Sequence, residues 1–161
     1  MTIRNANIKI KGPGYQKTGI TNTGTMTFES GTVELSDESS LTAISNSGDL
    51  TILSGNITTD GYGDAIRNSN NLTLGEAEDS SSPNYGLDTA NVSTTDPYIY
   101  ASYGNGIKNT GKLYFYDGKI IGSEASITKE PAGVEYLYEA IEHTDENNYH
   151  YRVLEWMRQQ P

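Results

Sequence analysis

Acidic side chains gather in two short segments where they could bind a cation or act as an acid–base pair. DGYGD contains Asp60 and Asp64, and GEAEDSSS contains Glu76, Glu78 and Asp79. Carboxylate oxygens, together with backbone carbonyls, are the ligands that Ca²⁺ prefers. Neither segment has the spacing of an EF-hand or of a glycine-rich calcium-binding repeat. We therefore interpret both segments as solvated loops and expect no metal site.

The same carboxylates allow an alternative hypothesis, that the chain is a fragment of a carbohydrate-active enzyme. A glycoside hydrolase uses two carboxylates at a defined separation, and a polysaccharide lyase uses calcium-holding carboxylates with a basic residue nearby. Asp60, Asp64 or Glu76 would act in such a groove. His143 and His150 belong to no Ser–His–Asp or metal-binding pattern, so both are expected at the surface. No catalytic constellation recurs in the sequence, and neither catalytic residues nor a cofactor is expected.

Tyrosine is the most abundant aromatic residue, with 12 copies in 161 residues. Exposed rings can stack on sugar rings, and their hydroxyl groups add hydrogen bonds. The alternative is that the rings pack a long loop against the rest of the fold. The candidate ligand-binding residues are Tyr98, Tyr100, Tyr103, Tyr114 and Tyr116.

A repeat in the sequence indicates which elements position these residues. GITNTGTMTFESGTVEL at 19–35 and AISNSGDLTILSGNITT at 43–59 share one order: Ile, Asn, Gly, an apolar pair, Gly and a further apolar residue. Aligned repeats place in one column the asparagines Asn5, Asn22, Asn46, Asn68 and Asn109, separated by 17, 24, 22 and 41 residues. Each asparagine stands two residues after an isoleucine, at Ile3, Ile20, Ile44, Ile66 and Ile107.

The period and the apolar pattern predict a solenoid. A repeat of about 22–24 residues is typical of stacked units that share one continuous core. Apolar residues alternate within each repeat, as in a strand with one face inward, and glycines at Gly31, Gly55 and Gly118 mark turns. No helical segment separates the strands. We predict an all-β parallel β-helix of about four to five coils, each advancing about 4.8 Å along the axis.

The repeated asparagine has a structural explanation. Asn tolerates a left-handed backbone, and its amide is both donor and acceptor, so stacked Asn22, Asn46, Asn68 and Asn109 would bond from coil to coil. A neighbouring column consists of Arg4, Thr21, Ser45, Arg67 and Lys108. It carries cations without carboxylate partners, so it does not complete the set that a lyase needs.

The pattern predicts repeats over 1–122, interrupted by a long loop at 75–105, and a C-terminal cap over 123–161. In the cap, apolar residues alternate with polar ones on both sides of a turn at 145–148, at Val134, Tyr136, Tyr138, Tyr149, Tyr151 and Val153. Such alternation predicts a β-hairpin, whereas Leu137, Tyr138 and Ile141 would also suit a short helix. Trp156 is expected to anchor the cap in the core. Because TIRNANIKIKG starts inside a repeat, the chain is expected to be part of a longer protein.

The composition and charge of the chain indicate which classes of partner are not expected. The chain has 21 acidic and 11 basic residues, a formal charge of −10, so nucleic-acid binding is not expected. No apolar run approaches the length of a membrane span, so membrane insertion is not expected either. Hydrophobic residues make up only 34% of the chain, and cysteine is absent. The absence of cysteine is compatible with both a reducing and an oxidising compartment.

AISNSGDLTILSGNI and GIKNTGKLYFYDGKIIG resemble the repeats of right-handed parallel β-helix domains in large surface proteins of Gram-positive bacteria. The resemblance covers residues 19–122, and the segment 72–122 resembles a recurrent final block of those domains. Departures are the long loop from Gly75 to Gly104 and the first repeat, where Asn7 replaces the usual glycine. The resemblance implies a secreted or wall-anchored, adhesin-like module, extracellular or in the cell wall, that presents loops to a glycan or host surface protein.

Overall fold

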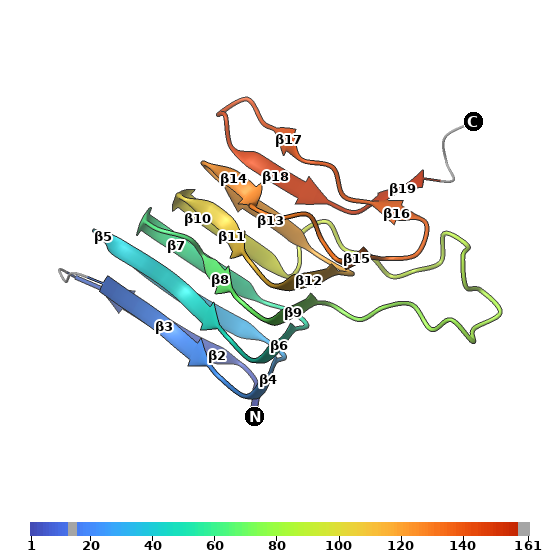
Figure 1. Ribbon diagram of the computed structural model, residues 1–161, viewed down its shortest axis with the longest axis horizontal. Coiled ribbons are helices and arrows are strands. Elements are labelled where there is room, and N and C mark those ends of the chain that lie inside the picture. Colours follow the sequence, from blue (N-terminus) through green and yellow to red (C-terminus); the bar gives the residue numbers. More distant parts are fainter. Residues whose placement is uncertain (13–15, 158–161) are drawn as a thin grey trace.

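Each repeat of the sequence forms one turn of a parallel β-solenoid (Figure 1). The computed structural model describes residues 1–12 and 16–157, which form about five turns followed by an antiparallel hairpin sheet at the C-terminal end. The predicted all-β parallel β-helix with a C-terminal hairpin is confirmed. Within these residues, no helix has the length and hydropathy of a membrane-spanning segment.

Three segments make up each turn. The first turn contains β1 (Thr2–Ile3), β2 (Ala6–Lys11) and β3 (Gln16–Asn22), and the second contains β4 (Thr25–Phe28) and the long β5 (Gly31–Asn46). The third contains β6 (Asp49–Ile52), β7 (Asn56–Tyr62) and β8 (Ile66–Asn68), and the fourth β9 (Asn71–Leu74), β10 (Tyr98–Tyr103) and β11 (Asn105–Asn109). The fifth contains β12 (Lys112–Phe115), β13 (Lys119–Gly122) and β14 (Ala125–Ile127).

The strands of successive turns pair in parallel and form the faces of the solenoid. One sheet has the order β1-β4-β6-β9-β12-β15. In the other sheet β5 serves two faces, because residues 32–36 pair with β7 and residues 44–46 pair with β8. The isoleucines of the repeat are direct partners in this sheet, with Ile44 beside Ile20 and Ile66 beside Ile44 and Ile107. The alignment of the last four repeats is therefore confirmed.

The core is a stack of apolar layers inside the tube. Met26, Leu50, Leu72 and Leu113 are partners on successive strands, and none is more than 3% exposed. Burying one such side chain contributes about 1.5–3 kcal/mol. A chain with few apolar residues can thus fold, because nearly all of those in the repeat face inward.

Glycines turn the chain between the first and second faces. Gly31, Gly55 and Gly118 have φ angles of 121°, 113° and 102°, in the left-handed region where a side chain is strained. A Cβ at Gly55 would lie 2.4 Å from the carbonyl oxygen of Gly31, so the turns also stack too closely for any side chain. The predicted glycine turns are confirmed.

The predicted place of Asn5 in the asparagine column is wrong. Ile3 pairs with Phe28, and Asn5 lies at the corner between β1 and β2, where it has a φ of 51°. Its backbone N–H donates to the hydroxyl of Ser30 at 2.9 Å, at a different corner from Asn22. The Ile-x-Asn triplet is too short to identify a corner by itself. Asn5 and Asn22 occupy different corners, so their separation of 17 residues is less than one full turn.

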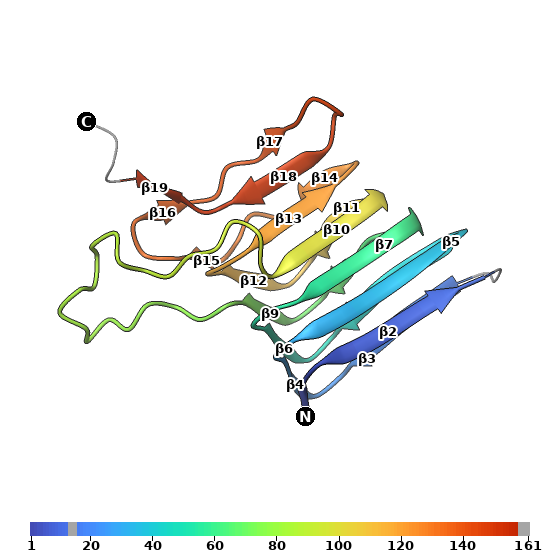
Figure 2. The ribbon, with the colours of Figure 1, turned by 180° about the vertical axis from the view of Figure 1, so that it is seen from behind.

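The long loop connects β9 to β10 and covers residues 75–97. It is shorter than the predicted 75–105 because residues 98–103 form strand β10. Figures 1 and 2 show the loop extending away from the solenoid on the side of β9, β12 and β16.

The cap contains β15 (Gly133–Val134), β16 (Tyr138–Glu139), β17 (His143–Thr144), β18 (His150–Val153) and β19 (Glu155–Trp156). Strand β18 pairs antiparallel with β13 and with β17, and the turn at 145–148 is confirmed by a bond from Asn148 N to Asp145 O of 3.1 Å. The predicted first arm, Val134 to Tyr138, is wrong, since β17 pairs with β18 instead. Trp156 is partly buried and packs against the core, as predicted. It also contacts the Tyr138 ring.

Arg152 ties the cap to the last turn of the solenoid. It is 6% exposed, and its guanidinium donates to both carboxylate oxygens of Glu130 at 2.6 and 2.7 Å. It also donates to the Ser126 hydroxyl at 3.1 Å and to the Ala140 carbonyl at 2.9 Å. A planar guanidinium suits this arrangement because its donors point in fixed directions.

Candidate functional site

The asparagine column is a continuous side-chain ladder. Each Nδ2 donates to the Oδ1 of the next turn, from Asn22 to Asn46 at 2.8 Å, Asn46 to Asn68 at 2.8 Å, and Asn68 to Asn109 at 2.9 Å. All four side chains are buried. The Nδ2 groups of Asn22, Asn46 and Asn68 are used within the fold, so the ladder is structural. Among the described residues, Nδ2 of Asn109 has no hydrogen-bond partner.

Asp64 is part of a corner of the solenoid. It is 5% exposed, and its Oδ1 accepts the backbone N–H and the side-chain amide of Asn105 at 3.0 and 2.9 Å. Its Oδ2 accepts Nε of Arg67 at 3.1 Å. Arg4, in the same predicted column, forms an ion pair with Glu29. The prediction that the cationic column lacks carboxylate partners is therefore wrong for Arg4 and Arg67. The pair of Asp64 and Arg67 was not predicted because Asp64, between β7 and β8, has no counterpart in the repeated pattern.

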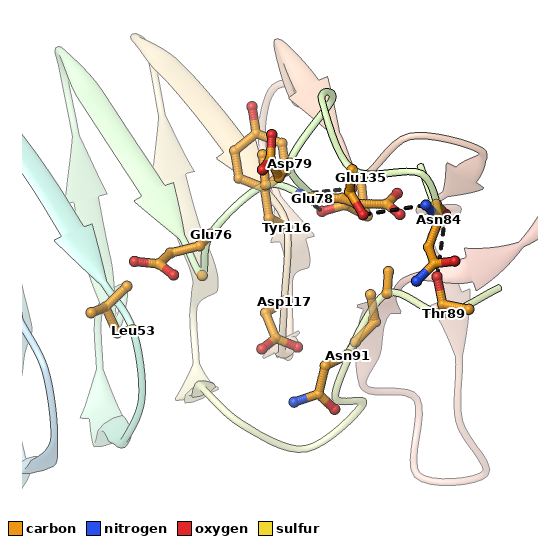
Figure 3. A pocket seen from close by; sticks show the side chains of 15 residues that line it. Leu53, Glu76, Glu78, Asp79, Asn84, Thr89, Asn91, Tyr116, Asp117 and Glu135 are labelled. Carbon is orange, nitrogen blue, oxygen red and sulfur yellow. Dashed lines mark hydrogen bonds between the residues drawn. The ribbon is translucent and has the colours of Figure 1, made fainter. Parts of the chain in front are cut away.

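The second predicted carboxylate cluster lines a pocket of about 480 Å³ between the long loop and the solenoid (Figure 3). Glu76, Glu78 and Asp79 lie in its wall, together with Asp117 and Glu135, which the sequence did not single out. Within residues 1–12 and 16–157, no group of three or more His, Cys, Asp or Glu side chains is placed to hold a metal ion.

Glu135 holds the beginning of the long loop. Its two carboxylate oxygens accept the backbone N–H of Glu78 at 3.1 and 3.0 Å, the contact drawn in Figure 3. Burial raises the pKa of this carboxyl above its ordinary 4.5, against the hydrogen bonds from Glu78 and Tyr136, which lower it. The carboxylate therefore braces the loop at a cost in desolvation.

The end of the long loop is held by two more carboxylates. Asp96 accepts the Ser54 hydroxyl at 2.9 Å and the backbone N–H of Gly55 at 2.7 Å. Asp117 accepts the backbone N–H of Ser93, and burial raises its pKa despite that bond. Asp96, Asp117 and Glu135 thus attach the long loop to the rest of the fold.

Four of the five candidate tyrosines pack against protein. Tyr98 stacks on Tyr100 with ring centroids 6.1 Å apart, and Tyr100 stacks on Tyr149 of the cap at 5.8 Å. Tyr114 stacks on Tyr116 at 6.4 Å, and Tyr116 lines the acidic pocket. Burial raises the pKa of Tyr98, Tyr100 and Tyr116, as expected for hydroxyls removed from water.

Tyr103 differs from the other candidates. It is 59% exposed and contacts Tyr62, which is 62% exposed, with ring centroids 5.5 Å apart and planes inclined at 38°. The two rings line an open concavity of about 640 Å³ together with Ser36, Asp37, Asp60 and Gly61. We call this concavity the Tyr62–Tyr103 site. The sequence did not single out Tyr62, although it stands 41 residues before Tyr103, the spacing that separates Asn68 from Asn109.

Cationic residues line a smaller hollow on the face formed by β5, β8 and β11. It has a volume of about 220 Å³ and contains Arg67 and Lys108, which are partners on adjacent strands, and Ser45. Elsewhere, His143 contacts the Glu155 carboxylate at 2.7 Å and His150 lies 3.7 Å from Glu142. The two histidines therefore take part in surface pairs within the cap.

Comparison with known proteins does not indicate a function for these residues. Comparisons of the chain with protein families, with curated proteins and with solved structures give no match. Function therefore has to be argued from the site itself. Asp64 is a corner residue, Glu76 lies in the loop pocket, and Asp60 lies beside Tyr62 and Tyr103. The arrangement offers exposed rings and carboxylates for binding.

Proposed function

We propose that this chain is a structural and adhesive module of a bacterial surface protein, which presents loops to a glycan or protein partner without catalysis. The observation that carries the proposal is the braced loop at 75–97. Loops longer than about 12–15 residues without secondary structure of their own are usually either functional or disordered. This one has fixed attachments along its length, which favours a function.

The loop is attached near its start, in its middle and at its end. Near its start, Glu78 is bound by Glu135. Midway, Tyr85 stacks on Tyr136 with centroids 4.4 Å apart, and Asp88 accepts the hydroxyl of Tyr138 at 2.9 Å. Its end is bound through Asp96 to Gly55, in the turn before β7. Presenting a preformed loop reduces the entropy lost on binding, as an adhesive surface requires.

The solenoid suits the role of a rigid support. Parallel strand pairing continues from turn to turn, and the buried asparagine ladder links four of the turns. The resemblance of the repeats to bacterial surface domains supports an extracellular or cell-wall location. The alternative, a polysaccharide lyase or glycoside hydrolase, gains no support from the separate positions of Asp60, Asp64 and Glu76.

Binding of the purified chain to immobilised glycans and to host surface proteins tests the proposal. We expect saturable binding to at least one partner, reduced when residues 79–92 are replaced by a short Gly-Ser linker or when the Tyr62–Tyr103 site is altered. Circular dichroism and urea unfolding of the loop-replaced chain check that the solenoid remains folded. Turnover of acidic polysaccharides, with or without calcium, that is lost on Asp60→Asn would replace the proposal with the enzyme hypothesis.

A further inference from the structure

We infer that the Tyr62–Tyr103 site binds a pyranose oligosaccharide without acidic groups, and that it binds amine-bearing sugars most tightly. This inference rests on the proposed function, because it names the ligand class of an adhesive module. The site lies at the Tyr103 end of β10, whereas the long loop joins β10 at Tyr98. The two candidate surfaces can therefore be altered independently.

The exposure of the two rings is the first observation. Tyr62 and Tyr103 come from neighbouring turns, since β7 and β10 are paired and these two residues are partners. Tyr100 and Tyr85 stack on cap residues, but Tyr62 and Tyr103 contact each other and remain more than half exposed. Rings this exposed bury little apolar area in the fold, so packing does not account for them.

Adjacent exposed rings suit the apolar C–H face of a pyranose. An aromatic ring offers a flat apolar surface, and each tyrosine adds a hydroxyl that can bond to sugar hydroxyls. Because the two rings are inclined at 38°, they form two adjoining apolar surfaces that are not coplanar. The concavity of about 640 Å³ lies within the size range of small-molecule sites and is open to solvent, as a sugar chain requires.

The charges around the rings favour one class of sugar. Asp60 is exposed at the edge of the concavity, and a carboxylate accepts strong hydrogen bonds from hydroxyl groups and from ammonium groups. Asp37, which also lines the concavity, forms an ion pair with Lys17 at 2.9 Å. The chain as a whole carries a formal charge of −10, which repels acidic sugars. We therefore expect affinity to fall from amine-bearing to neutral to acidic oligosaccharides.

Isothermal titration calorimetry with three matched tetrasaccharides tests this order. The probes are the tetramers of glucosamine, N-acetylglucosamine and galacturonic acid, at low salt and slightly below neutral pH. We expect the dissociation constant to be lowest for glucosamine and highest for galacturonic acid. Added salt should weaken the preference for glucosamine over N-acetylglucosamine, since charge attraction is screened.

Variants assign the binding to the two rings. Tyr103→Ala should weaken binding of the glucosamine tetramer by about tenfold, and Tyr62→Ala similarly, because each removes a stacking surface. Tyr103→Phe should retain most of the affinity. Ile141→Ala removes an apolar side chain of the cap that is 51% exposed and lies outside both candidate surfaces, so it is the control and should leave binding unchanged.

A charge variant tests whether Asp60 causes the preference for amine-bearing sugars. Asp60→Asn should reduce the preference for glucosamine over N-acetylglucosamine by about threefold, the size of one exposed charge interaction. Glu146→Gln is the control, because it makes the same change in net charge at an exposed residue of the cap turn. Equal effects of the two variants would show that only overall charge matters and would overturn the role of Asp60.

Other outcomes separate this inference from the proposed function. Glycan binding that survives both alanine variants, or tightest binding of galacturonic acid, would overturn the inference and leave the adhesive module standing. A tetralysine peptide that binds as tightly as the glucosamine tetramer, and loses binding in the same variants, would overturn the sugar assignment in favour of a cationic protein segment. Absence of binding to every glycan and protein probe would overturn both.

Discussion

The side-chain nitrogen of Asn46 lies 2.8 Å from Oδ1 of Asn68, one turn further along the solenoid. Asn46 also accepts the Asn22 amide at 2.8 Å and donates to the carbonyls of Gly48 and Asn71 at 3.1 and 2.9 Å. With 2% of its surface exposed, it has no access to water as a replacement partner. One buried side chain thus joins three successive turns.

Replacement of Asn46 should therefore cost more stability than loss of one hydrogen bond. Asn46→Ala removes the hydrogen-bond partners of Asn68 Oδ1 and of the Gly48 backbone N–H, so we expect a loss of about 3 kcal/mol in the free energy of unfolding. Urea denaturation followed by circular dichroism measures it, with an unchanged m-value as the check on comparable transitions. Asn109→Ala should cost less, because Asn109 Nδ2 has no hydrogen-bond partner within the described part of the chain. Equal losses would contradict this account of the ladder.

Gly24 and Gly48 occupy equivalent positions in successive turns and differ in what covers them. A Cβ at Gly48 would lie 2.1 Å from the carbonyl oxygen of Gly24, whereas a Cβ at Gly24 would meet no atom within 4 Å. Gly48→Ala should lower the free energy of unfolding by about 2 kcal/mol or more, and Gly24→Ala should change it by less than about 0.5 kcal/mol. Thermal and urea unfolding of the two variants compare the same substitution with and without a turn stacked against it. A Gly24→Ala variant as unstable as Gly48→Ala would show that local conformation, not stacking, requires glycine here.

The pH dependence of stability should reveal the raised pKa of the Glu135 carboxyl. Its pKa is raised by burial, so the folded chain binds this proton more readily than the unfolded chain. The stability contributed at Glu135 therefore rises as the pH falls from neutral through the raised pKa toward the ordinary 4.5. In Glu135→Gln this rise is absent, and the variant's stability relative to wild type should decline over that interval. Urea unfolding at a series of pH values measures the difference.

Glu130→Gln provides a contrast of opposite sign. The hydrogen bonds from Arg152 lower the pKa of Glu130 below its ordinary 4.5. Its stabilising contribution is present above that value and is lost as the pH falls through the lowered pKa. The difference between this variant and wild type should therefore change below pH 4.5, not above it. Parallel profiles for the two variants would contradict the separate environments of Glu130 and Glu135.

The attachment of the long loop through Asp96 should be visible in hydrogen exchange. Asp96→Ala removes acceptors for the Ser54 hydroxyl and for the Gly55 amide, so the free energy of local opening should fall by about 2 kcal/mol. The Gly55 amide and the amides of residues 90–96 should exchange faster, with little change in the core of the solenoid. Asp79→Ala is the control, because the Asp79 bonds reach only Ser81 within the loop. Unchanged exchange at Gly55 in Asp96→Ala would show that the loop end is held by other contacts.

The repeat pattern was enough to predict the solenoid because each repeated residue meets its own kind in the next turn. Ile66 pairs with Ile44 and Ile107, and the inward side chains at these positions have the same volume and polarity from turn to turn. The asparagine ladder was predictable for the same reason, since an amide both donates and accepts. Asn5 was misplaced because one short triplet carries too little information to identify its corner.

The candidate site depended on contacts between residues far apart in the chain. Tyr100 is partly buried because Tyr149 of the cap stacks on it, whereas Tyr103 has no such neighbour from the described part of the cap and remains exposed. The local sequence around the two tyrosines does not predict this difference. Glu135 and Asp117 were not predicted to brace the loop, because they lie 57 and 24 residues from the amides they bind. A local pattern determines which side of a strand faces inward. Only the packing of distant segments decides which outward side chains remain open to a ligand.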